Sequence, residues 1–168
     1  MLFAILLLAN SCLTLRDSDK KMVKKFQEIG QDIEIYHDTF NGKSIRYVSR
    51  TIFDKSKPTI IFVHGAPGSL DNYYKYLQDV DLQEKANLVA VDRLGYGYSE
   101  FGKTETSIAK QADVINFIAN KYTENKIILM SWSFGGPIIG KMAIDNPSIY
   151  IKHTLLEQRN VMEQIKNS

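Results

Sequence analysis

A short apolar run that leads into a tight turn constrains the fold of this chain more than any other feature. The run is Ile-Ile-Leu-Met at residues 127–130, and Ser131-Trp132-Ser133-Phe134-Gly135-Gly136 follows it, ahead of a stretch with helical spacing. We interpret this pattern as a buried strand, a sharp turn and a helix, with Ser133 held clear of the sheet at the tip. The pattern Ser-x-Gly alone means little, since with serine and glycine each at about 7% a chain of this length contains it about once by chance. The interpretation therefore depends on the rest of the sequence.

Two further apolar runs end in loops that hold unusual residues. Residues 59–63 are followed by His64-Gly65-Ala66-Pro67-Gly68, and residues 87–91 are followed by Asp92-Arg93 and a glycine-rich stretch. A chance match to His-Gly-x-Pro-Gly is on the order of one in a thousand for this length. Such a turn can aim backbone N–H groups at one point, as an oxyanion hole requires; a tight turn fixed by the proline is the alternative. If the three runs are parallel neighbours, all three loops lie at the carboxyl edge of one sheet.

The remaining patterns predict an α/β fold. Two alternating stretches, residues 33–37 and 44–48, flank Asn41-Gly42 and predict a β-hairpin. Helical spacing of apolar residues predicts helices over residues 17–30, 70–82, 107–122 and 136–144. A hairpin followed by alternating strands and helices calls for a mostly parallel sheet with helices on both faces. With 168 residues, 44% of them hydrophobic, the chain is long enough to bury the core of one domain.

The three loops together resemble those of the α/β-hydrolase family. His-Gly-Ala-Pro-Gly, then Asp-Arg-Leu-Gly-Tyr-Gly-Tyr-Ser from residue 92, then Ser-Trp-Ser-Phe-Gly-Gly stand in the family's order, and the resemblance covers residues 33–147. It is similar to the branch of proline iminopeptidase-like and esterase-like enzymes, and this part of the chain corresponds to the N-terminal half of the fold. The resemblance implies that Ser133 is the nucleophile and that the backbone N–H groups of Ala66 and Phe134 form the oxyanion hole.

The resemblance also assigns supporting roles and shows one local departure. His64, Gly65, Asp92 and Arg93 are implied to support the site rather than to perform chemistry. The family's elbow is Gly-x-Ser-x-Gly, and Ser131 replaces its first glycine. Because that position lies close to the neighbouring helix, it needs a small side chain, and we expect serine there to be tolerated as the last residue of the strand.

The acid and the base of the family's triad are harder to place. The family order is Ser, then Asp or Glu, then His, and the histidine takes the serine's proton. After Ser133 the sole histidine is His153, which we expect at the start of a sixth strand, far from the elbow; Asp145 is expected to be a capping or surface residue. We expect His64 to shape its own loop and His37 to lie half exposed in the first strand.

The sequence therefore predicts a truncated serine hydrolase that acts on an ester, amide or peptide bond and is crippled by the loss of its triad acid and histidine. Its partners would be a small-molecule or peptide substrate. The alternative is a non-catalytic, degenerate hydrolase fold that serves as a surface binding module or has no function.

Composition and missing motifs exclude other classes of protein. The formal net charge of +2 and the absence of a basic stripe argue against nucleic acid binding. Gly-x-Gly-x-x-Gly does not occur after the first strand, so we expect no cofactor. The three histidines are scattered without a His-Glu-x-x-His motif, so we expect no metal.

The first residues differ from the rest of the chain. Residues 2–9 are almost entirely apolar, too short a run to span a membrane, and are followed by the single cysteine, Cys12. The stretch resembles a bacterial lipoprotein signal, which leaves open lipidation of Cys12, plain cleavage or an uncleaved anchor. We divide the chain into a leader (1–16), a linker helix (17–30), a partial hydrolase domain (31–150) and an irregular or helical tail (151–168). The expected location is the bacterial cell envelope, lipid-anchored or secreted, and otherwise the cytoplasm.

Overall fold

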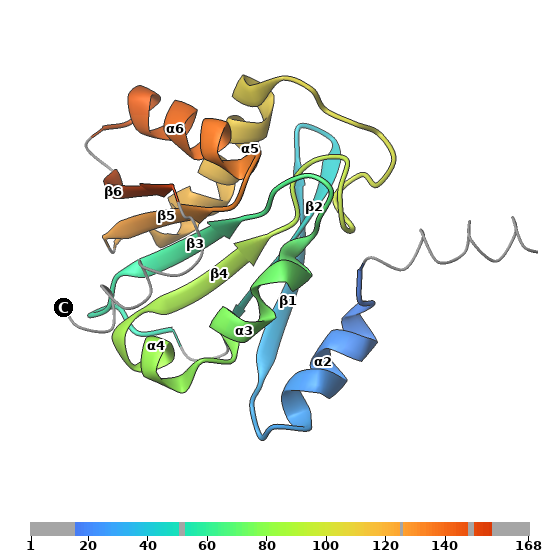
Figure 1. Ribbon diagram of the computed structural model, residues 1–168, viewed down its shortest axis with the longest axis vertical. Coiled ribbons are helices and arrows are strands. Elements are labelled where there is room, and N and C mark those ends of the chain that lie inside the picture. Colours follow the sequence, from blue (N-terminus) through green and yellow to red (C-terminus); the bar gives the residue numbers. More distant parts are fainter. Residues whose placement is uncertain (1–15, 51–52, 125, 148–149, 156–168) are drawn as a thin grey trace, which may run out of the picture.

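The protein contains one six-stranded sheet in the order β1-β2-β4-β3-β5-β6 (Figure 1). The computed structural model describes residues 16–50, 53–124, 126–147 and 150–155. Strands β4, β3, β5 and β6 run parallel, whereas β1 and β2 form an antiparallel hairpin at one edge. The strands are β1 Ile33–Phe40, β2 Lys43–Arg50, β3 Thr59–Val63, β4 Asn87–Val91, β5 Ile127–Ser131 and β6 Tyr150–Leu155. The predicted mostly parallel α/β sheet is confirmed.

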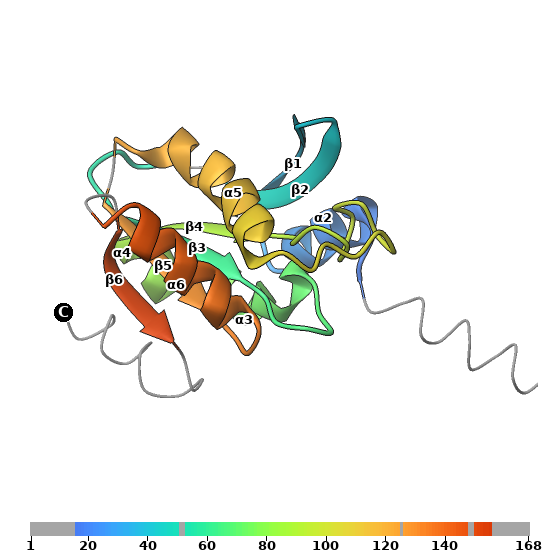
Figure 2. The same cartoon turned by 90° about the horizontal axis from the view of Figure 1, so that it is seen from above.

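Helices cover both faces of this sheet, as expected (Figures 1 and 2). The two longest of the described helices, α5 Ile108–Ala119 and α6 Gly135–Asp145, pack on one face. A 3-10 turn at Asn120–Tyr122 follows α5. The opposite face is covered by a 3-10 turn at Leu70–Tyr73 and three helices, α2 Asp19–Gln27, α3 Tyr74–Leu77 and α4 Val80–Lys85.

Strand β3 shows how one sheet supplies two cores. Successive side chains of a strand point to opposite faces. Ile61 and Val63 join the core under α5 and α6, whereas Ile60 and Phe62 join the core under α2, α3 and α4. All five residues of β3 are buried, which explains why the sequence there is continuously apolar rather than alternating.

The stretch expected as one helix over residues 70–82 is broken into three short pieces. Asp79 interrupts it: its backbone is extended, and its side chain accepts a hydrogen bond from the N–H of Leu82 at 3.1 Å, which caps α4. Ser69 caps the first piece in the same way through the N–H of Asp71. The apolar spacing is helical across the whole stretch, so spacing alone did not reveal the interruption.

Helix α2, expected as a linker, is an integral part of the domain. Ser18 caps it by accepting a hydrogen bond from the N–H of Lys21. Met22 and Phe26 are fully buried in the core beneath α3 and α4. The segment over residues 17–30 therefore packs against the sheet instead of spanning a gap between parts.

Two of the predicted boundaries fall near residues outside the described ranges. Strand β6 occupies residues 150–155, so the stretch expected to be irregular or helical from residue 151 begins as strand. Residues 156–168 lie outside the described ranges, as do residues 1–15 with the expected leader and Cys12. Within the described part of the chain, no helix has the length and apolarity that crossing a bilayer requires.

Candidate active site

The turn between β5 and α6 carries Ser133 on a strained backbone. Ser133 has φ +50°, in the left-handed region that residues with a side chain seldom adopt. Three backbone hydrogen bonds hold this turn: Trp132 donates to the Val63 carbonyl at 3.3 Å, and Gly135 and Gly136 donate at 2.9 Å to the carbonyls of Trp132 and Ser133. The Ser133 side chain is exposed at the tip. The sharp strand-turn-helix geometry predicted from the sequence is present.

Two glycines make this turn possible because neighbouring atoms leave no room for a side chain. A Cβ on Gly135 would lie 2.3 Å from the Val63 carbonyl oxygen and 2.9 Å from the Ser131 Cβ. A Cβ on Gly65 would lie 2.9 Å from the Ser133 Cβ. The loop after β3 therefore lies directly against the serine, and both glycines are required by close approach.

Ser131, which replaces the first glycine of the elbow, is the last residue of β5 and pairs with Val63, as expected. Its side chain is buried, and its Oγ has no hydrogen-bond partner within the described part of the chain. The position accepts a small side chain at the cost of an unsatisfied hydroxyl.

His64 lies in the loop after β3 with both ring nitrogens engaged. The N–H of Arg93 donates to Nε2 at 3.0 Å, so the proton resides on Nδ1, which donates to the Gly65 carbonyl at 2.7 Å. Burial, reinforced by the nearby Arg93 charge, lowers the pKa of His64 to about 3. His64 is therefore a neutral residue that shapes its loop, not a base for Ser133.

Arg93 joins the loop after β4 to the loop after β3. Its Nη2 donates to the Gly65 carbonyl at 2.8 Å, and its guanidinium carbon lies 4.4 Å from the centre of the Tyr96 ring and 5.3 Å from that of Phe134. The side chain is fully buried, and burial lowers its pKa. Arg93 is thus packed between the two loops that resemblance assigns to the oxyanion hole.

Asp92 ties three segments together beneath the site. Its carboxylate accepts hydrogen bonds from the N–H of Leu70 at 2.8 Å and of Tyr98 at 3.0 Å, and from Nη1 of Arg46 at 3.2 Å. A Cβ on Gly97 would lie 2.0 Å from the Asp92 carboxyl carbon, so the glycine-rich loop wraps tightly around this carboxylate. Asp92 thus joins Arg46 of β2, Leu70 and the glycine-rich loop after β4.

Arg46 is a participant that sequence reasoning missed. It lies in β2, fully buried, and contacts Asp92 as well as Asp19 of α2, whose Oδ1 is 2.8 Å from the Arg46 Nε. The alternation along residues 44–48 predicted a strand but gave no role to this side chain. The available signal was the run Ile-Arg-Tyr-Val, in which a charged residue interrupts positions that are otherwise apolar.

The other candidate acids and bases lie elsewhere. His37 is in the edge strand β1, three strands from β3 and four from β5 in the sheet, and its Nε2 lies 2.8 Å from the Asp19 carboxylate. Asp145 ends α6 and pairs with Lys141 at 2.5 Å on the surface, as expected. The backbone of His153 pairs with Leu129 in the middle of β6, not at its start as expected.

Two cavities in the described part of the chain lie away from the elbow. A cavity of about 390 Å³ lies between the tip of the β1–β2 hairpin and α5, and another of about 320 Å³ lies beside α4; neither is lined by the elbow residues. In the ranges that the structure describes, no group of three or more His, Cys, Asp or Glu residues could hold a metal ion.

The comparisons with known proteins agree with this geometry. A sequence model described as "alpha/beta hydrolase fold" matches residues 58–158, which is more than half of the chain. The chain belongs to the α/β-hydrolase family. The match extends from the residue before β3 through the elbow and β6.

Curated relatives of this α/β-hydrolase chain are distant. A 1-acylglycerol-3-phosphate O-acyltransferase from Arabidopsis thaliana is 27% identical over 134 residues, covering 76% of this chain and 31% of the relative. The dihydrolipoyllysine-residue acetyltransferase component of an acetoin cleaving system from Cupriavidus necator is 26% identical over 107 residues, covering 64% of this chain and 27% of the relative. The chain thus spans about a third of the length of the curated relatives that it matches.

Solved structures share the fold at low identity. A membrane phospholipase A described as a bacterial virulence factor superposes with a TM-score of 0.65 at 23% identity, over 92% of this chain and 50% of that one. An epoxide hydrolase from Vigna radiata gives a TM-score of 0.62 at 18% identity, over 72% of this chain and 37% of that one. At these identities the likeness shows the fold alone.

Proposed function

We propose that this protein is a serine hydrolase in which Ser133 forms an acyl-enzyme on an ester, amide or peptide bond. The observation that carries the proposal is the left-handed backbone of Ser133, exposed at the tip of the elbow and packed against the loop of His64 and Gly65. Strain at an exposed serine between a strand and a helix is the geometry of an activated nucleophile. The neighbouring backbone N–H groups supply the other requirement of acyl transfer.

The chemistry would run in two steps. The Ser133 oxygen adds to the substrate carbonyl, and the resulting oxyanion accepts hydrogen bonds from the N–H groups of Ala66 and Phe134. When the carbonyl re-forms, the leaving group departs with a proton, and water then releases the acyl group by the same route. No cofactor and no metal are needed for either step.

A base must take the Ser133 proton, and the described histidines do not supply one. Both nitrogens of His64 are engaged, and His37 pairs with Asp19 in the hairpin at one edge of the sheet. Removing the histidine of a triad lowers kcat by about 10⁶ in a serine protease, with a small residue of activity left from binding and the oxyanion hole. We therefore infer little or no turnover by this chain alone.

The substrate class rests on the relatives and on two aromatic side chains. The 1-acylglycerol-3-phosphate O-acyltransferase among the curated relatives favours a carboxylic ester with an apolar acyl group. Trp132 and Phe134 flank Ser133 in sequence and are 39% and 41% exposed, so both can contact such a group. This supports the esterase-like side of the branch more than the proline iminopeptidase-like side.

The location remains a separate proposal. The apolar residues 2–9 and Cys12 support a leader of the lipoprotein type, with attachment to or secretion into a bacterial cell envelope. These residues lie outside the described ranges, and the proposal depends on sequence alone.

A non-catalytic binding module is the second candidate. The observation in its favour is that the ring nitrogens of His64, the histidine nearest to the elbow, are both occupied. In this case the exposed aromatic residues beside Ser133 would bind a ligand without cleaving it.

Reaction with a fluorophosphonate probe tests the nucleophile directly. We expect slow, stoichiometric phosphonylation of Ser133, located by mass spectrometry of the peptide that contains the elbow. The Ser133→Ala protein should not react, and Ser131→Ala should react as the unmodified protein does, since Ser131 is buried in the strand. Absence of an adduct on Ser133, or labelling that heat denaturation does not abolish, would contradict the proposal.

The inference of low turnover has its own measurement. Hydrolysis of p-nitrophenyl butyrate by the purified chain should stay near the rate of the Ser133→Ala protein. Turnover typical of an esterase, from about 1 to 10³ per second, would show that a base acts on Ser133 and would overturn this part of the proposal.

A further inference from the structure

The peptide group between Gly65 and Ala66 is held by an unusual pair of donors. The Gly65 carbonyl accepts a hydrogen bond from Nδ1 of His64 at 2.7 Å and another from Nη2 of Arg93 at 2.8 Å. Both donors are fully buried. A carbonyl with both lone pairs engaged by buried donors is fixed in direction.

The same peptide group carries the N–H that would bind the oxyanion. A peptide is planar, and the cis bond of this loop is the next one, Ala66–Pro67, so in the trans Gly65–Ala66 peptide the carbonyl and the N–H point in opposite directions. Fixing the Gly65 carbonyl towards His64 and Arg93 therefore turns the Ala66 N–H away from them. Gly65 itself lies against Ser133, so this peptide group lies beside the elbow.

Hydrogen bonds that share one peptide group reinforce each other. Donors on the carbonyl draw electron density towards its oxygen and leave the N–H more strongly polarised, especially where the surroundings are of low dielectric. A charged donor has a larger effect than a neutral one. Arg93 is charged, and His64 is neutral.

A carbonyl and two aromatic rings face the Arg93 charge, but no acidic side chain pairs with it in the described ranges. Within the described ranges Arg93 makes no ion pair, and its Nε and Nη1 are buried without a hydrogen-bond partner. A buried, unpaired cation is costly, and a neutral donor would hold the loop at lower cost. Its guanidinium also lies against the ring of Phe134, whose N–H is the second proposed oxyanion donor.

We propose that Arg93 and His64 are positioning residues that aim and polarise the Ala66 N–H as an oxyanion donor. Arg93 adds the field of its charge at the point where negative charge develops during acyl transfer. The inference rests on the proposed function of Ser133. It goes further by assigning an electrostatic task to a motif otherwise regarded as structural support.

A purely structural role of residue 93 would not require a charge on its side chain. To tie the two loops together, a side chain must only donate a hydrogen bond to the Gly65 carbonyl. Arg93→Gln keeps a neutral donor and removes the charge. Arg50→Gln is the matched control, because Arg50 ends β2 and bonds to Gln31 and to the Asp32 carbonyl at a distance from the elbow.

Nuclear magnetic resonance reads the polarisation without requiring catalysis. In Arg93→Gln we expect the Ala66 amide proton to move upfield, while in Arg50→Gln it stays near its original position. In the unmodified protein the Gly65 carbonyl carbon should resonate downfield of its random-coil value, which tests the double acceptor even if Arg93→Gln does not fold. An unmoved Ala66 amide in a folded Arg93→Gln protein, or a random-coil Gly65 carbonyl shift, would overturn the inference.

Binding of phenylboronic acid reads the consequence for an anion at the elbow. The Ser133 oxygen bonds to boron, the serine proton passes to solvent, no bond of the boronic acid breaks, and the boron becomes a tetrahedral anion. We expect Arg93→Gln to weaken this binding about tenfold. That effect is smaller than the fall in kcat of about 10²–10³-fold that follows outright removal of an oxyanion donor. Arg50→Gln should stay within about twofold of the unmodified protein, since Arg50 bonds to Gln31 and Asp32 at a distance from the elbow.

The outcomes separate the inference from the proposed function. If Ser133→Ala binds the boronate as tightly as the unmodified protein, or neither binds it, the nucleophile proposal fails while the amide shifts still test the polarisation. If the boronate binds at Ser133 and Arg93→Gln binds it equally well, the polarisation inference fails and the nucleophile proposal stands.

Discussion

At the scale of single residues, the elbow depends on two positions that have room only for glycine. Gly65 and Gly135 both lie where a Cβ would approach within 3 Å of another atom, and in both cases that atom belongs to the elbow or to the strand beside it. The strain of the Ser133 backbone persists because the hydrogen bonds and the packing around it leave no other arrangement.

Replacing Gly135 by alanine should therefore distort the elbow. The new Cβ would lie 2.3 Å from the Val63 carbonyl oxygen, which is backbone and cannot rotate away. We expect Gly135→Ala to lower the free energy of unfolding by about 2–3 kcal/mol, as overpacking in a core does. Urea denaturation measures the change.

Gly140 in the same helix provides the control. A Cβ there meets no heavy atom within 4 Å, so Gly140→Ala should raise the stability of α6 by about 0.5–1 kcal/mol through helix propensity. Equal effects of the two substitutions would show that close approach to β3 does not constrain the elbow.

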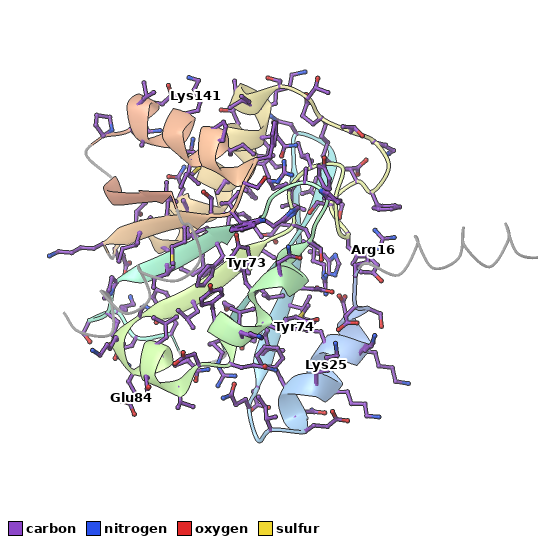
Figure 3. All side chains as sticks on the ribbon, in the orientation of Figure 1. Arg16, Lys25, Tyr73, Tyr74, Glu84 and Lys141 are labelled. Carbon is purple, nitrogen blue, oxygen red and sulfur yellow. The ribbon has the colours of Figure 1, made fainter. Side chains whose placement is uncertain are left out.

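At the scale of elements, α2 is fastened to the loops of the site through charged groups. Asp17 donates its N–H to the Asp71 carboxylate and accepts hydrogen bonds on its own carboxylate from Lys25 and from the Tyr74 hydroxyl. Figure 3 shows Lys25 and Tyr74 side by side where α2 meets α3, and the Lys25 Nζ lies 5.1 Å from the centre of the Tyr74 ring. Arg46 extends this connection to Asp92 beneath the elbow.

Asp71 makes the connection sensitive to pH. Burial raises the pKa of the Asp71 carboxyl to about 6; the hydrogen bond from the Asp17 N–H and the Arg46 charge oppose the rise, and the charges of Asp92 and Asp17 add to it. Because the folded state holds this proton more tightly than the unfolded chain, ionisation of Asp71 destabilises the fold as the pH rises from about 4 through about 6.

Asp71→Asn should remove that dependence. Asparagine keeps an acceptor for the Asp17 N–H without a charge, so the variant should gain stability relative to the unmodified protein as the pH rises. We expect a gain on the order of 1–2 kcal/mol at pH 8, after allowance for solvent screening, and none at pH 4. Urea denaturation of both proteins from pH 4 to pH 8 gives the difference; a constant difference would contradict the assignment.

At the scale of the whole molecule, two cores share one sheet. Ile115 of α5 is buried in one core and Phe26 of α2 in the other, and alternate residues of β3 contribute to each. Neither core can lose its packing without exposing a face of the same strands. We therefore expect the described elements to unfold together.

Truncation in either core should destabilise the whole unit. Ile115→Ala and Phe26→Ala should each lower the free energy of unfolding by about 2–5 kcal/mol and leave a single transition with an unchanged denaturant slope. Ile29→Ala is the control, since this side chain follows α2 and is 51% exposed. An early separate transition in Phe26→Ala, with the rest of the signal unchanged, would show that α2 unfolds independently as a linker would.

Much of this architecture could be predicted because local chemistry specifies it. The bounds of β3 and β4 follow from uninterrupted apolar runs with glycine, proline or acidic residues at their ends. The Asn41-Gly42 turn between β1 and β2 follows from the tolerance of these residues for positive φ. Glycine after Ser133 and after His64 marked the two places where backbones approach each other.

Contacts between segments that are distant in the chain could not be predicted from the sequence. Burial of Arg46 depends on Asp92 and Asp19, which lie 46 residues after it and 27 residues before it, so no local pattern distinguishes it from an exposed arginine. The break at Asp79 depends on capping geometry rather than on apolar spacing. The inclusion of α2 in the core depends on its packing against one face of the sheet, which no residue adjacent to it in the chain specifies.

The sequence by itself determined the order of strands and helices, the strained turn at Ser133 and the loops that surround it, because each is specified by residues adjacent in the chain. Only the tertiary structure decided what those loops do to one another. It brought the Gly65 carbonyl between His64 and Arg93, engaged both nitrogens of His64 and set α2 against Asp71. Such contacts join residues that are far apart in the sequence. They can form and stabilise the protein only when the folded sheet has brought those residues together.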